Sequence, residues 1–133
     1  MKGLYLAMKT QVVIQLATLW MARICAVAMF LFWGAFFVEH LQEWFFRPDG
    51  RLPPPSVWRG QALHLAMLLG LATIIFRPGW GAIITTAATV AFFASIGMRG
   101  FPYLALLNLP PVLLALIHVS CKSAEPLGAA VDR

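Results

Sequence analysis

The chain has 133 residues, of which 61% are hydrophobic and only 11% are charged. A soluble globular domain carries about 25% charged residues, so this composition excludes an ordinary soluble domain and favours an integral membrane protein. The net charge of +5 comes from scattered basic residues rather than from a basic stripe interleaved with aromatic residues, so nucleic acid is not an expected partner.

Residues 1–19 precede the first clear apolar span. Gln11, Gln15 and Thr18 have the spacing that gives a helix one polar face. We therefore predict an N-terminal extension, which either lies along the membrane surface as an interfacial helix or lengthens the first span. No small-residue cleavage site precedes Arg23, so we expect this segment to be retained.

Four apolar segments follow, at residues 20–44, 57–76, 80–98 and 102–121. Each has about 19 to 25 residues, which is enough for a helix to cross roughly 30 Å of hydrocarbon. Short connections with proline and glycine turn signals make neighbouring helices antiparallel. We therefore predict an all-α fold, an integral membrane four-helix bundle with up-down-up-down topology over residues 20–121, and a flexible tail over residues 122–133.

Aromatic and basic residues at the ends of these segments predict the topology. Trp20 and Trp80 are expected interfacial anchors on one side of the membrane, and Trp44, Trp58 and Tyr103 on the other. Basic residues on the side of the termini are Lys2, Lys9, Arg23, Arg77, Lys122 and Arg133, against Arg47, Arg51, Arg59 and Arg99 on the other side. The excess predicts a bacterial inner-membrane protein with both termini in the cytoplasm and with membrane lipids around it.

The last apolar segment contains Asn108, Pro110 and Pro111. Prolines remove backbone donors and kink a helix, so two interpretations stay open. The first is a packing kink whose freed carbonyls are satisfied by neighbouring helices. The second is a broken helix that lines a cavity, as in small transporters.

The most informative cluster is Glu39, His40 and Glu43, at the far end of the first span. On a helix these side chains fall within an arc of about 100°. His64, with Gln61 one turn away, is expected at a similar depth on the next helix. Ionisable groups at membrane depth are costly and usually have a partner or a function, so we predict that the cluster converges near one membrane face.

Two interpretations of the cluster need no metal. In the first, the charges only pair with one another: Glu43 with Arg47, and Glu39 with His64 or Arg59. In the second, a histidine beside a carboxylate handles protons or binds a quinone headgroup, because its ordinary pKa is close to neutral pH.

Two further interpretations involve a cofactor. His40, His64, Glu39 and Glu43 are ligand types that suit iron or zinc, although the order His-x-x-Glu reverses the Glu-x-x-His of di-iron bundles. His40 and His64 at matching depth are also a candidate pair of axial haem ligands. His118 is expected near the opposite face, where it cannot join them.

The chain contains no nucleophile motif, phosphate-binding glycine loop or dinucleotide fingerprint, so no catalytic residue is predicted. The dense aromatic surface of the first span favours contact with lipid, quinone, other membrane subunits or a second copy of the chain. We therefore predict an accessory or structural subunit of a membrane complex. The alternatives are a metal- or haem-binding redox protein and a small transporter.

The layout of residues 23–119 resembles the small four-helix bacterial membrane proteins of the DoxX-like group. The likeness rests on Arg23, Gly34, the run Leu68-Leu69-Gly70-Leu71 and Arg77. It implies an accessory role beside a quinone-linked redox system. Glu39-His40 stands where the group more usually has a glycine and a basic residue, and His64 where an acidic residue often opens the second helix, so no site residue is transferred.

Overall fold

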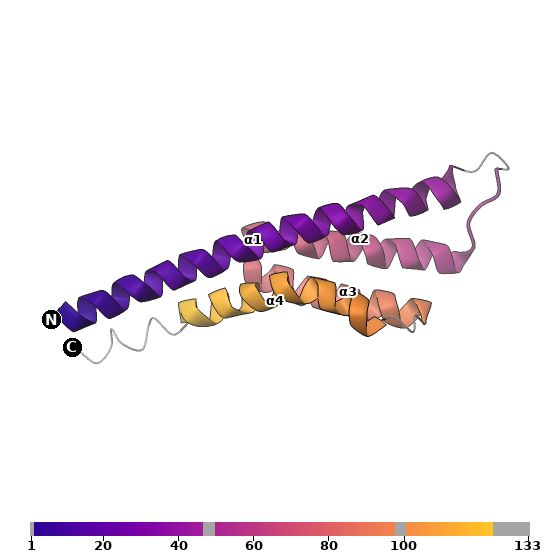
Figure 1. Ribbon diagram of the computed structural model, residues 1–133. Coiled ribbons are helices and arrows are strands. Elements are labelled where there is room, and N and C mark those ends of the chain that lie inside the picture. The colour runs from indigo at the N-terminus through magenta and orange to yellow at the C-terminus, as the bar shows by residue number, and fades with distance from the viewer. Residues whose placement is uncertain (1, 47–49, 98–100, 124–133) are drawn as a thin grey trace.

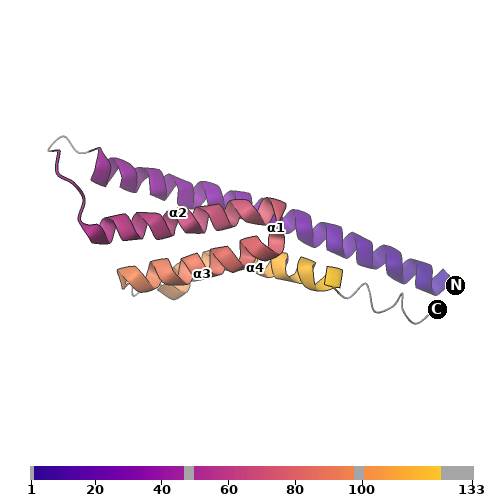
Figure 2. The same cartoon turned by 180° about the vertical axis from the view of Figure 1, so that it is seen from behind.

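The computed structural model describes residues 2–46, 50–97 and 101–123. Its regular structure consists of α1 (Lys2–Phe45), α2 (Pro55–Phe76), α3 (Pro78–Ile96) and α4 (Phe101–Ser123). Successive helices run antiparallel (Figures 1 and 2). The predicted all-α arrangement of four packed helices is confirmed.

The apolar character of three helices indicates a multi-pass membrane protein. In α1, α2 and α3 the described residues include apolar stretches long enough to cross a membrane. The apolar stretch described in α4, Asn108–Cys121, is shorter, so the fourth span stays a prediction.

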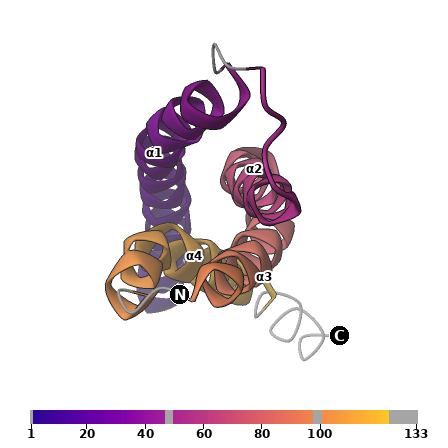
Figure 3. The ribbon, with the colours of Figure 1, turned by 90° about the vertical axis from the view of Figure 1, so that its right-hand side faces the viewer.

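The four helices pack around a common axis. Each helix contacts the next one along the chain, and α4 returns to pack against α1. Figure 3 shows this arrangement end on, with α2 and α3 on one side and α1 and α4 on the other. The end of α1, the start of α2 and the end of α3 therefore lie at the same end of the bundle (Figure 1).

Proline and glycine set several helix limits. Pro55 and Pro78 are the first residues of α2 and α3, where a missing N–H costs nothing. Gly97 ends α3 with φ 61° and ψ 29°, the left-handed conformation that glycine adopts without steric strain. α2 and α3 therefore each begin two residues before the predicted start.

The N-terminal extension is continuous with the first span. α1 has 44 residues, and its first turns project beyond the other helices (Figure 1). The Gln15 side chain donates a hydrogen bond to the Cys121 carbonyl at 3.2 Å, and His118 Nδ1 donates to the Gln15 carbonyl at 3.2 Å. The extension therefore lengthens the first helix and packs on the end of α4, and His118 serves this contact.

The broken-helix interpretation of α4 is not supported. Pro110 and Pro111 lie inside one helix that continues from Phe101 to Ser123. Pro111 is buried, so it packs against the neighbouring helices. The helix also takes in residues 122 and 123 of the predicted tail, while residues 124–133 lie outside the described residues.

A polar contact joins the helices in the middle of the apolar core. Asn108 of α4 is buried; its Oδ1 accepts a hydrogen bond from Trp33 Nε1 of α1 at 2.9 Å. Its Nδ2 donates to Thr89 Oγ1 of α3 at 3.0 Å and lies 3.2 Å from Met67 Sδ of α2. Asn108 is therefore a packing residue in contact with all three other helices.

Candidate ligand-binding cavity

A cavity of about 530 Å³ lies at the end of the bundle where α1 and α3 end and α2 begins. Ligand pockets in proteins have volumes of about 300 to 1,000 Å³, so its size suits a small ligand. Its lining residues come from α1, α2 and α3, and are Phe32, Trp33, Phe36, His40, Trp44, Ser56, Val57, Gly60, Gln61, His64, Phe92, Phe93, Ser95 and Ile96.

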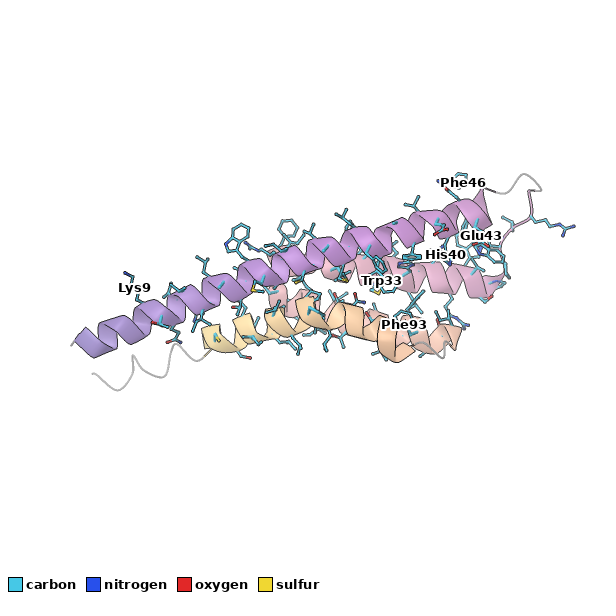
Figure 4. All side chains as sticks on the ribbon, in the orientation of Figure 1. Lys9, Trp33, His40, Glu43, Phe46 and Phe93 are labelled. Atoms are coloured by element: carbon cyan, nitrogen blue, oxygen red, sulfur yellow. The ribbon has the colours of Figure 1, made fainter. Side chains whose placement is uncertain are left out.

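Aromatic rings surround the imidazole of His64. The ring centroids of Trp33, Phe37 and Phe92 lie 5.9, 5.3 and 5.2 Å from that of the imidazole. Phe93 stands edge-on to Trp33 at 6.0 Å. Figure 4 shows Trp33 and Phe93 pointing from α1 and α3 into the space between the helices. These contacts hold the imidazole in place within an apolar surround.

Two polar atoms of this wall have no partner. Gln61 and His64 are 8% and 4% exposed, and in the part of the chain that the structure describes neither Gln61 Oε1 nor His64 Nε2 forms a hydrogen bond. Because a buried polar atom without a partner is costly, a polar group, either an ordered water or a ligand, is expected beside these two atoms.

His40 reaches the same cavity from α1. Its Nδ1 donates a hydrogen bond to the Phe36 carbonyl, 3.0 Å away, and the residue as a whole is exposed. In Figure 4 its side chain points from α1 toward α2. His40 and His64 therefore line the same cavity, with one residue exposed and the other buried.

The predicted carboxylates do not join the two histidines. Glu39 and Glu43 are exposed, and neither lines the cavity. Over residues 2–46, 50–97 and 101–123, no group of three or more His, Cys, Asp or Glu side chains is arranged to hold a metal ion. The geometry thus gives no support to the iron or zinc site that we predicted from Glu39, His40, Glu43 and His64.

The charge-pairing interpretation is only partly tested. The predicted bond between Glu39 and His64 is not formed at His64 Nε2, because that atom has no partner among the described residues. The predicted partner of Glu43, Arg47, lies outside the described residues. The burial of His64 therefore has to be explained by something other than this pair.

The predicted interfacial residues lie at the two ends of the bundle. Trp20 and Trp80 are exposed at the end where α2 passes into α3. Trp58, which packs edge-on against Phe45 with centroids 4.5 Å apart, and the half-buried Trp44 lie at the cavity end. The side chain of Tyr103 lies outside the described set. The role of these residues as membrane anchors stays a prediction.

Several residues of the cavity were not predicted from the sequence. Phe92 and Phe93 come from α3, and nothing in their spacing links them to His64. Trp33 belongs to the aromatic surface that we predicted for the first span. Its distance of four residues from Phe37 places both side chains on one helix face. This spacing is the one available signal, because Phe37 and Trp33 both contact His64.

Comparison with known proteins gives no further assignment. The chain matches no protein-family model, no curated protein and no solved structure.

Proposed function

We propose that the protein is an accessory subunit of a membrane complex, and that its cavity binds the ring of a quinone-class ligand. We place it in the bacterial inner membrane, with four spans and both termini in the cytoplasm. The resemblance to the DoxX-like group implies a role of the same kind. The apolar helices support the membrane location, and the cavity supports the ligand.

One observation carries the ligand proposal: two unpaired polar atoms, Gln61 Oε1 and His64 Nε2, belong to residues that line a mainly apolar cavity rich in aromatic side chains. A quinone ring has a flat apolar body and a pair of oxygen atoms at its edge. The body packs against the rings of Trp33 and Phe92. Gln61 Oε1 and His64 Nε2 are both acceptors, so the two hydroxyl groups of the reduced ring donate to them, and the Gln61 amide nitrogen donates to a carbonyl oxygen of the oxidised ring.

Tryptophan fluorescence provides the test, because Trp33 and Trp44 line the cavity. The protein, purified in mild detergent, is titrated with decylubiquinone and with its reduced form. We expect saturable quenching. We expect His64→Leu and Gln61→Leu each to weaken the apparent affinity by about tenfold, the loss that corresponds to one buried hydrogen bond.

Thr85→Val is the matched control. The Thr85 hydroxyl is also buried without a partner among the described residues, but Thr85 does not line the cavity. The control should bind the ligand like the unchanged protein. Quenching that does not saturate, or equal effects of all three substitutions, would rule out the ligand proposal.

A second candidate, bis-imidazole haem binding, is favoured by the two histidines of the cavity. His40 holds the Phe36 carbonyl with Nδ1, which leaves its Nε2 available, and His64 Nε2 has no hydrogen-bond partner among the described residues. Haem and metal ligands are commonly oriented in this way. An absorption spectrum and metal analysis of the purified protein test this candidate. A Soret band that is present in the unchanged protein and absent from His40→Ala and His64→Ala would support haem binding.

The accessory role is tested in the same preparation. The mass of the protein–detergent particle is measured by light scattering and compared with that of the 14.7 kDa chain. We expect a defined larger complex in mild detergent. A monomer that carries neither ligand nor partner would contradict the accessory role.

A further inference from the structure

A second hollow lies at the opposite end of the bundle, between α1 and the end of α2. Its volume is about 670 Å³. We call it the Arg23 groove and define it by Trp20, Arg23, Ile24, Val27, Leu31 and Phe76. Five of these six side chains are apolar and exposed, so the groove faces the surroundings of the bundle rather than its core.

Arg23 is the charged group of the groove. It is half-buried; its Nε donates a hydrogen bond to the Ile75 carbonyl at 2.9 Å, and its guanidinium carbon lies 5.3 Å from the centre of the Trp20 ring. A guanidinium has five N–H donors, so one bond leaves both terminal nitrogens for a further acceptor.

No carboxylate described in the structure can neutralise Arg23. In the described parts of the chain the acidic residues are Glu39 and Glu43. They follow Arg23 on the same helix by 16 residues or more, which is roughly 24 Å along the axis. A half-buried cation in an apolar surround favours an external anion, because an unpaired charge is costly there.

The position of Arg23 in the bundle gives the depth of that anion. Ile75 belongs to the last turn of α2, whose carbonyls lack partners within the helix, so Arg23 caps this helix end. α2 ends one residue later, and Trp20 stands beside Arg23. Arginine and tryptophan at a helix end are typical of the headgroup level of a bilayer.

The apolar part of the groove runs away from this level toward the middle of the bundle. Ile24, Val27 and Leu31 lie on one side of α1 and extend about 12 Å beyond Arg23. A cation at headgroup level with an apolar stripe below it is complementary to a phospholipid. The exposed Arg77 in the turn after α2 adds positive charge at the same end.

We propose that the Arg23 groove binds one anionic glycerophospholipid of the surrounding bilayer. The phosphate accepts hydrogen bonds from the terminal nitrogens of Arg23, whose planar fork matches phosphate oxygens. One acyl chain lies along Ile24, Val27 and Leu31. The net negative charge of the lipid offsets the basic residues at this end.

Brominated lipids test the proposal, because bromine quenches tryptophan at short range and Trp20 lines the groove. The full-length protein is placed in nanodiscs that contain brominated phosphatidylglycerol or brominated phosphatidylcholine at equal fraction. The signal of Trp20 is the difference between the unchanged protein and Trp20→Phe. We expect phosphatidylglycerol to occupy the site about fivefold more than phosphatidylcholine.

Two variants and a control complete the experiment. Arg23→Gln should remove the preference, whereas Arg59→Gln, at an exposed arginine of the opposite end of the bundle, should keep it. Ala28 also lines the groove, so Ala28→Phe fills it while Arg23 stays in place. This variant should also lower the preference even if Arg23→Gln destabilises α2. Equal quenching by the two lipids, as expected if a protein partner covers the groove, would overturn the proposal, as would an unchanged preference in Arg23→Gln or Ala28→Phe.

Discussion

Asn108 is the residue whose removal should affect the bundle most directly. It accepts a hydrogen bond from Trp33 and donates one to Thr89, and each partner lies on a different helix. In Asn108→Leu the Trp33 N–H and the Thr89 hydroxyl lose these partners in the buried core of the bundle. We expect the free energy of unfolding to fall by about 1–2 kcal/mol, measured by reversible unfolding in mixed micelles.

A double-mutant cycle separates this hydrogen bond from the change in shape. In a Trp33→Phe background the loss caused by Asn108→Leu should be smaller by about 0.5–1 kcal/mol, because the indole donor is already absent. Strictly additive losses would show that the bond contributes nothing beyond packing.

For the candidate site, the sequence predicts the depth of a residue along its helix but not the direction in which its side chain points. Counting residues from each helix end placed the Glu39–His40 pair and His64 at a similar depth, with Gln61 one turn from His64, and the structure brings His40, His64 and Gln61 to one cavity. The same count could not give rotation about the helix axis. Glu39 follows Val38 on a side of α1 that is exposed, so its carboxylate misses the cavity although its depth is right.

At the scale of elements, two glycines allow α2 and α3 to pack closely. A Cβ on Gly70 would lie 2.6 Å from the Thr85 main-chain nitrogen, and one on Gly81 would collide with the main chain of Ile74. Because both collisions are with backbone, the helices would have to move apart. We expect Gly70→Ala and Gly81→Ala each to lower the free energy of unfolding by about 1–3 kcal/mol.

Gly34→Ala provides the comparison for these substitutions. A Cβ at Gly34 would meet no atom within 4 Å, so this change tests helix propensity alone. It should be neutral or stabilise the protein by up to about 1 kcal/mol in the same micelle assay. Similar losses at all three glycines would indicate that the close approach of α2 and α3 does not matter.

The ends of a helix could be predicted from the residues at those ends, whereas the length of α1 depended on its contact with another helix. Pro78 and Gly97 bound α3 by their own backbone preferences, so the predicted limits are within two residues of those observed. The polar face around Gln15 could not choose between an interfacial helix and a longer first helix. The choice depends on Gln15 meeting His118 and Cys121 of α4, a contact about a hundred residues away in the sequence.

At the scale of the whole molecule, the length of α1 is out of proportion to a bilayer. Its 44 residues span about 66 Å, roughly twice the hydrocarbon thickness. Large apolar side chains are exposed along this length, including Val13, Leu16, Ile24 and Leu31. If the helix is upright, lipid covers only part of this surface. α1 therefore either tilts in the bilayer or contacts another subunit, and the proposed accessory role requires the second of these.

The orientation of the molecule yields the last prediction. Lys9 lies on α1 before its span and Arg77 in the turn between α2 and α3, whereas Arg51 precedes α2 at the cavity end. Single cysteines at these positions, in a Cys25→Ala and Cys121→Ala background, are treated with a membrane-impermeant maleimide in cells with a permeable outer membrane. The excess of basic residues on the side of the termini predicts that Arg51→Cys reacts in intact cells. Lys9→Cys and Arg77→Cys should react only after the inner membrane is opened.

The reverse pattern would invert the proposed orientation. Reaction of Arg51→Cys and Arg77→Cys from one side would contradict a membrane-spanning α2.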